Sequence, residues 1–147
     1  HPLRPRPQPF RAAQLQRLHV GARVIAVETH PGRAATLRKR FGPAVIVVRA
    51  DAAELRLPRR PYHVVANPPF SVTAALLRRI LQPGSRLVSA TLVLQEAAAR
   101  RWASPLAPGA PRWSRTFAVS LGDRVPRSAF TPRPRVDCRV LTIRRRT

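Results

Sequence analysis

The stretch VVANPPF, residues 64–70, joins a short apolar run to a turn stiffened by two prolines. The apolar run predicts a buried strand, and a helix-like segment, Val72–Leu81, follows it. In open α/β sheets, ligands bind at the carboxyl edge of the strands. At that edge Asn67 offers one acceptor and two donors, and Phe70 offers a flat aromatic face. The stretch therefore predicts a pocket for a planar base that carries an exocyclic amine.

Strands and helices alternate on both sides of this stretch. Apolar runs predict strands at Arg23–Glu28, Ala44–Arg49 and Tyr62–Ala66, with a helix between the first two that starts at Pro31 and ends at Gly42-Pro43. Downstream we expect a strand at Leu87–Leu94, a helix at Gln95–Trp102, a loop at Ser104–Pro111, strands at Thr116–Leu121 and Val136–Ile143, and an extended segment at Phe130–Asp137. The last two strands are antiparallel to each other by analogy only. Such alternation is typical of an α/β fold with a mainly parallel sheet.

The domain organisation is one catalytic domain behind a short lead. Residues 1–20 begin with a Pro/Arg-rich run that excludes a helix or a central strand, and Phe10–Leu18 predicts a short helix. Residues 21–147 form the α/β domain. At 147 residues, the chain is long enough to bury roughly two-thirds of its unfolded surface.

The charge of the chain is extreme. It holds 28 basic and 6 acidic residues, which gives a formal net charge of +22, and Lys39 is the sole lysine. Arginine binds phosphate through two parallel hydrogen bonds and stacks on bases, so this composition indicates nucleic acid, and RNA fits well. The alternative is GC-rich codon usage, which raises Arg, Ala and Pro together but does not by itself remove acids.

Several classes of protein are excluded by composition. Cys138 is the single cysteine, so an intramolecular disulfide and a cysteine-based zinc site are excluded, and His30 and His63 do not have the spacing of metal ligands. We expect no metal. No apolar run reaches the ~18 residues that span a bilayer, and no signal peptide opens the sequence. We expect a cytoplasmic monomer with no membrane partner.

Two acids fall at the ends of successive predicted strands. Glu28 ends its strand where a nucleoside-binding α/β fold places the carboxylate that accepts from ribose hydroxyls. Asp51 follows the next strand and could accept from an adenine amine. The alternatives are a solvated strand-end acid for Glu28 and a turn or helix cap for Asp51. Both acids are expected to line up with Asn67 along one edge.

The Asn67-Pro68-Pro69-Phe70 segment suits methyl transfer to an exocyclic amine. That reaction needs the nitrogen lone pair freed from conjugation with the ring. Hydrogen bonds from the two N–H groups to the Asn67 side-chain carbonyl and the Pro68 backbone carbonyl would favour a pyramidal nitrogen. Phe70 would stack on the base, a contact worth about 1–3 kcal/mol. The alternative is a tight proline turn that only closes a strand.

The cysteine and the two tryptophans are not assigned to the predicted site. Cys138 is expected to be a small core residue. Trp102 and Trp113 could be core residues or could stack on RNA, and the sequence does not separate these roles.

Together, these residues resemble the Erm family of S-adenosylmethionine-dependent rRNA adenine N6-methyltransferases. The resemblance runs from about Gly21 to Arg146 and includes the segments GARVIAVE, VVRADA, PYHVVANPPF, LVLQEA and SAFTPRPRVDCRVLTIRRR in this order. Asn-Pro-Pro-Phe alone also occurs in DNA adenine methylases. Related small-subunit dimethyladenosine transferases usually have Leu-Pro-Tyr after the Asn, so Pro-Pro-Phe favours the Erm branch.

The resemblance implies a Rossmann-like methyltransferase fold and a set of site residues. Glu28 and Asp51 would bind S-adenosylmethionine through its ribose and adenine, together with Asn67. Asn67, Pro68 and Phe70 would be catalytic and would hold the target adenine, with Phe130 as a further substrate residue. The implied function is methylation of an adenine of 23S rRNA, of the kind that gives resistance to macrolides, lincosamides and streptogramin B.

The sequence departs from the family pattern in two places. Relatives begin with a central strand and a glycine-rich loop for the methionine part of the cofactor, whereas the first glycine here is Gly21. Most relatives also carry a helical domain after the last strand. We therefore expect an N-terminally truncated chain with no C-terminal helical domain. Without the missing strand, we expect unpaired ladder groups beside Val24–Glu28.

Two other functions stay open at this point. One is a non-catalytic, RNA-binding remnant of the family, held to RNA by its arginines. The other is a DNA adenine N6-methylase, although the sequence holds no separate domain for target recognition.

Overall fold

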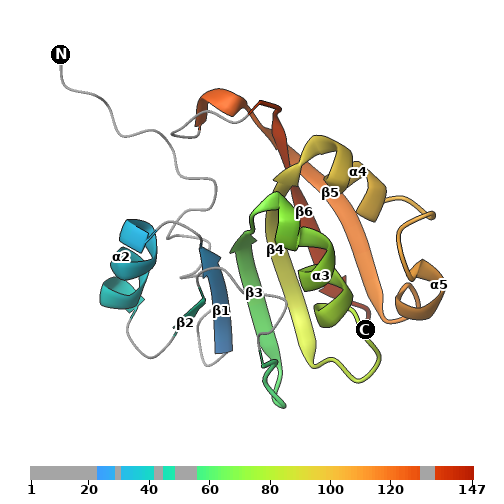
Figure 1. Cartoon of the computed structure of the whole chain (residues 1–147). Helices are drawn as coiled ribbons and strands as arrows, with labels where there is room; N and C mark the ends of the chain where they lie inside the picture. The colour runs from blue at the N-terminus through green and yellow to red at the C-terminus, as the bar shows by residue number, and fades with distance from the viewer. Residues whose placement is uncertain (1–22, 29–30, 42–44, 49–55, 130–134) are drawn as a thin grey trace.

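The computed structural model describes residues 23–28, 31–41, 45–48, 56–129 and 135–147. These residues form a six-stranded sheet in the order β2-β1-β3-β4-β6-β5, with helices beside it (Figure 1). The strands are β1 (Arg23–Glu28), β2 (Val45–Val48), β3 (Tyr62–Asn67), β4 (Leu87–Gln95), β5 (Phe117–Val125) and β6 (Cys138–Arg145). The helices are α2 (Pro31–Phe41), α3 (Phe70–Ile80), α4 (Glu96–Trp102), α5 (Ala110–Trp113) and the 3-10 turn η2 (Arg127–Ala129).

The first four strands along the sheet are parallel, as the alternation of strands and helices predicts. β1 pairs with β2 on one side and with β3 on the other, and β3 pairs with β4. The expected unpaired groups beside β1 are not found, because β3 pairs with it over six residue pairs from Arg23↔Tyr62 to Glu28↔Asn67. The carboxyl ends of these strands therefore meet at one edge of the sheet, called here the carboxyl edge.

The far side of the sheet is antiparallel. β6 lies between β4 and β5 and runs against both, which confirms the expected antiparallel pair and adds the pairing with β4. The ladder between β5 and β6 shifts between Leu121 and Arg124. Gly122 lies at this irregularity, where an added Cβ would approach the Val140 side chain and carbonyl at 3.2 Å. A side chain there would require Val140 to move by a few tenths of an ångström.

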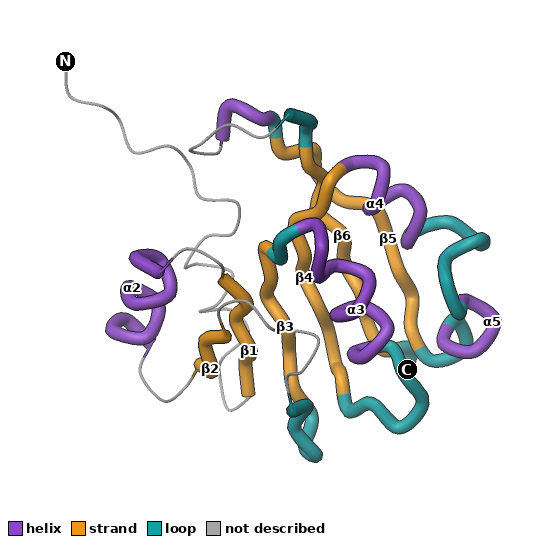
Figure 2. The backbone as a smooth tube through the Cα atoms, viewed as in Figure 1, coloured by secondary structure: helices purple, strands orange, loops and turns teal. Residues whose placement is uncertain are grey.

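The main core lies between the sheet and the helices α3 and α4, which cover one face of it (Figure 2). The alternating residues of the strands point to this face, where they meet the apolar side of α3. The largest buried side chains include Ile25, Leu76, Leu92, Leu141 and Phe117.

Three residues that the sequence left open or assigned to the core pack inside the protein. Trp102 and Trp113 are 4% and 8% exposed and belong to the core cluster, and the indole N–H of Trp113 donates to the Pro108 carbonyl at 2.9 Å. Cys138 is 3% exposed, as expected for a small core residue. Burial, together with the nearby Asp137 charge, raises the pKa of the Cys138 thiol to about 11. The thiol therefore stays protonated near neutral pH.

Most element boundaries agree with the sequence, and those that differ have local causes. Helix α3 starts at Phe70 rather than Val72, because the Pro69 carbonyl already accepts from the Val72 N–H. Gln95 ends β4 instead of starting a helix, since it pairs with Cys138. Helix α5 starts inside the expected loop, with Pro111 in its first turn, where a missing N–H costs nothing.

Candidate active site at the carboxyl edge of the sheet

Glu28 and Asn67 are brought together at the carboxyl edge. Each is the last residue of its strand, and the two are register partners in the β1–β3 ladder. Neighbouring strands lie about 4.8 Å apart, and register partners project to the same face of a sheet. That face is the one opposite α3, because Ile25 and Val64 on the alternate positions belong to the core under α3. The prediction that these two strand ends line up is confirmed.

The two side chains differ in exposure. Glu28 is only 2% exposed, which makes it one of two buried polar residues in the described part of the chain, the other being Thr73. Asn67 is half-buried. A buried carboxylate is costly unless it accepts hydrogen bonds, and Glu28 does interact within the protein. Its position as the last residue of β1 also places it at the edge where ligands bind in such sheets. A ribose offers two neighbouring hydroxyl donors that suit such a group.

The Pro68-Pro69 turn keeps one carbonyl free for a ligand. The Pro69 carbonyl accepts from the Val72 N–H at 2.9 Å and from the Thr73 hydroxyl at 3.3 Å. Among the described residues, none donates to the Pro68 carbonyl or pairs with the Asn67 side chain. Both oxygens that the sequence assigns to an amine therefore remain available on the same turn.

Phe70 stands at the start of α3 with 52% of its surface exposed. It is one of four large hydrophobic residues exposed in the described part of the chain. An aromatic ring directly after the Asn67-Pro68 turn, and not used by the core, is a suitable platform for a stacked base.

Two predicted site residues cannot be placed. Asp51 and Phe130 lie outside the described residues. Their assignment to the cofactor adenine and to the substrate stays a prediction. The expected lead at residues 1–20 also lies outside the described residues. The expected absence of the relatives' glycine-rich loop likewise stays a prediction.

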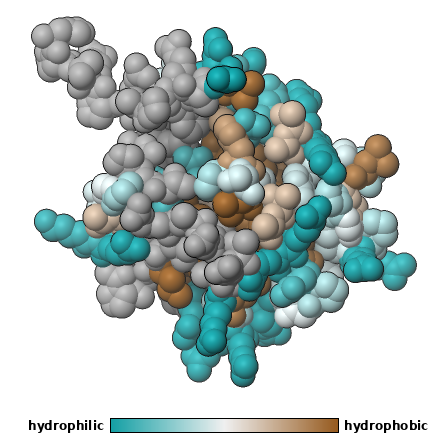
Figure 3. Space-filling view, viewed as in Figure 1, coloured by the Kyte–Doolittle hydropathy of each residue, from teal (hydrophilic) through white to brown (hydrophobic). Residues whose placement is uncertain are grey.

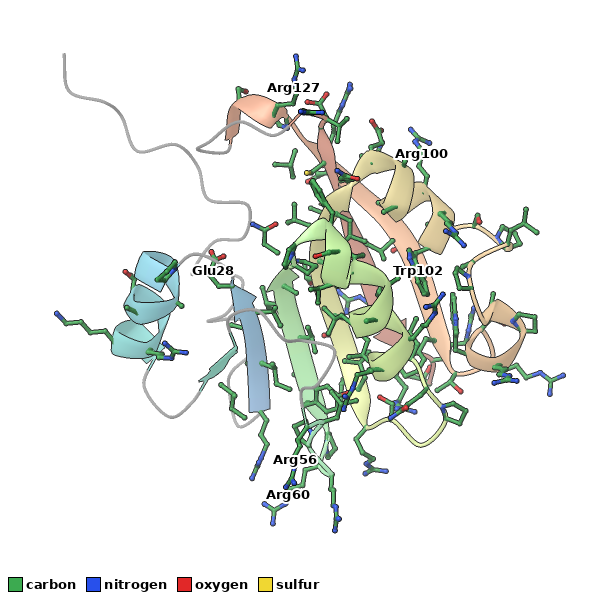
Figure 4. The ribbon with its side chains drawn as sticks, in the orientation of Figure 1. Glu28, Arg56, Arg60, Arg100, Trp102 and Arg127 are labelled. Carbon is green, nitrogen blue, oxygen red and sulfur yellow. The ribbon has the colours of Figure 1, made fainter. Side chains whose placement is uncertain are left out.

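A cavity lined by arginines opens further along the carboxyl edge. Its volume is about 1080 Å³, and it lies between the start of α4 and the segments around η2 (Figure 4, Arg100 and Arg127). Polar and small residues line it, together with five guanidinium groups and two carboxylates. The charged residues are Arg100, Arg124, Arg127, Arg135, Arg139, Glu96 and Asp137. The sequence indicated a basic protein but did not show which arginines meet.

The two carboxylates hold this cavity in shape. Glu96 pairs with Arg100 at 3.2 Å and with Arg139 at 3.3 Å. Arg139 also donates twice to the Gly122 carbonyl, at 3.1 and 2.9 Å, which ties β6 to the irregular part of β5. Although partial burial opposes it, hydrogen bonds from Arg139 and Arg100 keep the pKa of Glu96 below its usual range.

Asp137 performs the same task on the other wall. It accepts from the Arg127 backbone N–H and from the Arg124 guanidinium, both at 2.8 Å. The Arg127 backbone hydrogen bond is the main reason why the pKa of Asp137 lies below its usual range. Asp137 therefore fixes the start of η2, and its own backbone carbonyl accepts from the Glu96 N–H at 3.1 Å. The two walls of the cavity are joined at this point.

The described residues include neither a cluster of metal ligands nor a candidate membrane-spanning helix. No group of three or more His, Cys, Asp or Glu among them is arranged to hold a metal ion. None of the helices in the described ranges is long and apolar enough to cross a membrane.

A buried strand-end acid beside an Asn-Pro-Pro-aromatic turn, on a mainly parallel sheet, defines a nucleotide-binding enzyme fold of the methyltransferase class. The comparisons agree. The sequence profile of the family described as "Ribosomal RNA adenine dimethylase" matches residues 14–147. The chain therefore belongs to the ribosomal RNA adenine dimethylase family.

Its relatives include a protein named as a methyltransferase and a protein named as a resistance protein. It is 40% identical over 130 residues to "rRNA adenine N-6-methyltransferase" of Corynebacterium diphtheriae, covering 86% of this chain and 51% of that protein. It is 35% identical over 130 residues to "Mycinamicin-resistance protein MyrB" of Micromonospora griseorubida, covering 84% of this chain and 40% of that protein. The resemblance to the Erm type is confirmed. The chain spans about half the length of the curated relatives it matches.

The fold comparison gives the same class. The solved structure titled "Crystal structure of 23S rRNA methyltransferase ErmE" matches with a TM-score of 0.72 and 24% identity, covering 92% of this chain and 66% of that one. The Rossmann-like methyltransferase fold expected from the sequence is confirmed.

Proposed function

We propose that this chain is the catalytic part of an rRNA adenine N6-methyltransferase that takes its methyl group from S-adenosylmethionine. The observation that carries the proposal is the pairing of Glu28 with Asn67 at the carboxyl edge, next to the unused Pro68 carbonyl. The family and the names of the relatives support an adenine of ribosomal RNA as the substrate, and they do not favour a DNA adenine methylase.

The residues present fit the cofactor on its ribose side. Glu28, buried and ionisable, would accept from the two ribose hydroxyls, and Asn67 lies on the same face one strand away. When bound, S-adenosylmethionine supplies a methyl group on a positively charged sulfur. The protein's own task is then to hold an adenine amine in line with that group.

The Asn67 turn would hold the amine. The two N–H groups of the adenine amine would donate to the Asn67 side-chain oxygen and to the Pro68 carbonyl. These hydrogen bonds would favour a pyramidal nitrogen whose lone pair is not conjugated with the ring. Phe70 would stack on the base. Because the amine would become more acidic on gaining a methyl group as the sulfur–methyl bond breaks, it could release its proton to water, and this site would need no strong general base.

The arginine-lined cavity would hold the RNA that presents this adenine. Its five guanidinium groups outnumber its two carboxylates, and the surplus positive charge faces the same edge as the Asn67 turn. Phosphate contacts of this kind position an RNA without reading its sequence. The 23S rRNA and resistance to macrolides, lincosamides and streptogramin B are the finer part of the proposal, supported by the resistance protein among the relatives.

The test is methyl incorporation into 23S rRNA from labelled S-adenosylmethionine. We expect Asn67→Ala to lower incorporation by about 10²-fold or more, the usual effect of removing one hydrogen-bonding group from a reacting centre. Gln82→Ala is the matched control, because Gln82 is an exposed amide in the turn after α3. Glu28→Gln should weaken cofactor binding while RNA binding is kept.

A second candidate function follows from the arginine cavity itself. That cavity could hold RNA whether or not a cofactor binds, so a chain without catalysis would still be an RNA-binding protein. RNA binding by the unaltered chain with no methyl incorporation would support this candidate and reject the enzyme. Incorporation that survives Asn67→Ala would reject the assignment of the site.

A further inference from the structure

The opposite edge of the sheet, where the parallel strands begin, carries a group of arginines with no assigned task. These are Arg23, Arg56, Arg59, Arg60 and Arg86, which we call the amino-edge cluster. All five are exposed, and within the described chain none has a side-chain hydrogen bond or ion pair. Figure 4 shows Arg56 and Arg60 at the lower end of the molecule, far from Arg100 and Arg127.

The ladder places the members of the cluster side by side. Arg23 is the register partner of Tyr62, which follows Arg60 by two residues. The Tyr62 N–H donates to the Arg86 carbonyl at 3.3 Å, so Arg86 lies on the other side of the same residue. With strands about 4.8 Å apart, the starts of β1, β3 and β4 fall within about 10 Å. Hydrophilic side chains gather at this lower end of the space-filling view (Figure 3).

The cluster differs from the arginines of the cavity in having no carboxylate partner among the described residues. The four described acids all lie toward the carboxyl edge: Glu28, Glu96, Asp123 and Asp137. Another arginine at the amino edge, Arg145, shows what a structural role looks like there. Its guanidinium donates to the Leu87 carbonyl at 2.9 Å and to the Ser85 carbonyl, and it lies 4.9 Å from the centre of the Phe117 ring.

We infer that the amino edge is a second binding surface for the RNA backbone, separate from the site of methylation. Exposed guanidinium groups that have no partner in the described chain can bind phosphate oxygens through paired hydrogen bonds. The inference rests on the proposed function in one respect: the RNA is the ribosomal RNA that carries the target adenine.

An RNA fits this surface better than a membrane does. Proteins that bind membrane surfaces combine basic residues with apolar side chains that enter the lipid. Three of the four exposed large hydrophobics in the described chain lie elsewhere: Phe70 and Val136 are at the carboxyl edge, and Leu106 follows α4. Ile46, the register partner of Ile25, is the one that lies toward the amino edge. The amino edge therefore offers five charges and a single exposed isoleucine.

The distance between the two edges sets the size of RNA that can use both. Strands of six to nine residues span about 20–30 Å from one edge to the other. A stem-loop of a few base pairs that occupies the carboxyl edge does not reach the amino edge. A long folded rRNA can bend around the sheet and contact both.

The test compares two triple variants that remove the same charge. R59Q/R60Q/R86Q removes three members of the amino-edge cluster. R100Q/R101Q/R135Q, the comparison variant, removes three exposed arginines on α4 and at the cavity of the carboxyl edge. Binding to 23S rRNA and to a short stem-loop of it is measured without cofactor, over a range of salt concentrations. Thermal unfolding of each variant checks that both fold.

The expected result is selective. With 23S rRNA, the amino-edge variant should lose at least about tenfold in affinity, and its log–log salt slope should fall by about 2–3, or roughly one for each lost phosphate contact. With the stem-loop it should match the unaltered chain, whereas the comparison variant should bind both RNAs more weakly. Equal losses for the two variants on the stem-loop, or no loss for the amino-edge variant on 23S rRNA, would overturn the inference and leave codon usage as the source of these arginines.

Two further outcomes are decisive. Binding to vesicles of anionic lipid that depends on the cluster, with RNA binding unchanged, would replace RNA by a membrane and overturn the inference. Selective loss of 23S rRNA binding in a chain that transfers no methyl group would uphold the inference while the proposed function fails. The two proposals are thus tested independently.

Discussion

The two edges of one sheet use the same side chain in different ways. At the carboxyl edge, arginines are tied to Glu96 and Asp137 in a network that shapes a cavity of about 1080 Å³. At the amino edge, five exposed arginines have no partner among the described residues. The difference shows that the net charge of +22 is not distributed evenly over the surface. Carboxylates lie among the arginines of the carboxyl edge, where their ion pairs hold the cavity in shape. Each edge can be perturbed without the other.

After Asn67→Ala, the largest effect at the carboxyl edge is expected for Phe70→Ala. Loss of a base–aromatic stack worth about 1–3 kcal/mol should lower kcat/KM for rRNA methylation by roughly 5–150-fold. Phe70 is 52% exposed, so the unfolding temperature should hardly change. Phe70→Trp, which keeps a flat face, should retain most activity.

A suitable control for this prediction is Leu106→Ala. Leu106 is 90% exposed and lies in the loop after α4, so it tests the loss of an exposed apolar side chain away from the turn. Unchanged methylation in Phe70→Ala would show that the ring does not hold the base. It would also mean that the carboxyl edge has no aromatic platform for a base, so that its paired arginines alone would distinguish it from the amino edge.

A smaller effect is expected on stability in acid, and it would make the two edges alike. The pKa values of Glu96 and Asp137 lie below their usual 4.5 and 3.8. The unfolded chain therefore binds more protons in acid, and the stabilisation present above about pH 4.5 is lost as the pH falls through the folded pKa values. Protonation would remove the ion pairs of the carboxyl-edge arginines, and the amino-edge cluster has no ion pair in the described chain at any pH.

Urea unfolding at several pH values would measure this loss. In Asp137→Asn the stability at neutral pH should be lower, and its decrease below about pH 4 should be shallower than in the unaltered chain. Asp123→Asn is the control, because Asp123 is exposed and forms no ion pair with a described residue. The same pH profile in Asp137→Asn as in the unaltered chain would contradict the role given to this network.

How far the sequence reaches differs between the two edges as well. Hydrophobic period and turn residues predicted every described strand, and the order of strand-end residues placed Glu28 and Asn67 at the same edge of the sheet, because the carboxyl ends of parallel strands meet at one edge. The direct pairing of β1 with β3 was not predicted. Neighbours in a sheet are chosen by long-range contacts that no local pattern records, and β3 completes the ladder of β1.

The ion pairs were beyond sequence reasoning for a related reason. Glu96 and Arg139 are 43 residues apart and meet only because β6 inserts between β4 and β5. The nearest signal was the Pro-rich segment before Asp137, which indicated a fixed turn without revealing its partner, the Arg127 N–H. Likewise, the sequence counted arginines but could not sort them by edge. Asp51 and Phe130 stay predictions.

The smallest expected effect concerns His63, which lies between the two edges in β3. Its Nδ1 is 2.6 Å from the Ser89 hydroxyl on the neighbouring strand, and burial lowers its pKa below the usual 6.5. Between these two pKa values the unfolded chain binds more protons than the folded one, so stability falls as the pH decreases from about 6.5. His63→Gln should remove this slope, measured by urea unfolding between about pH 5 and pH 7, while changing rRNA binding at neither edge. A variant that keeps the slope would assign it to a different histidine, and a variant that alters rRNA binding would mean that the middle of the sheet couples the two edges.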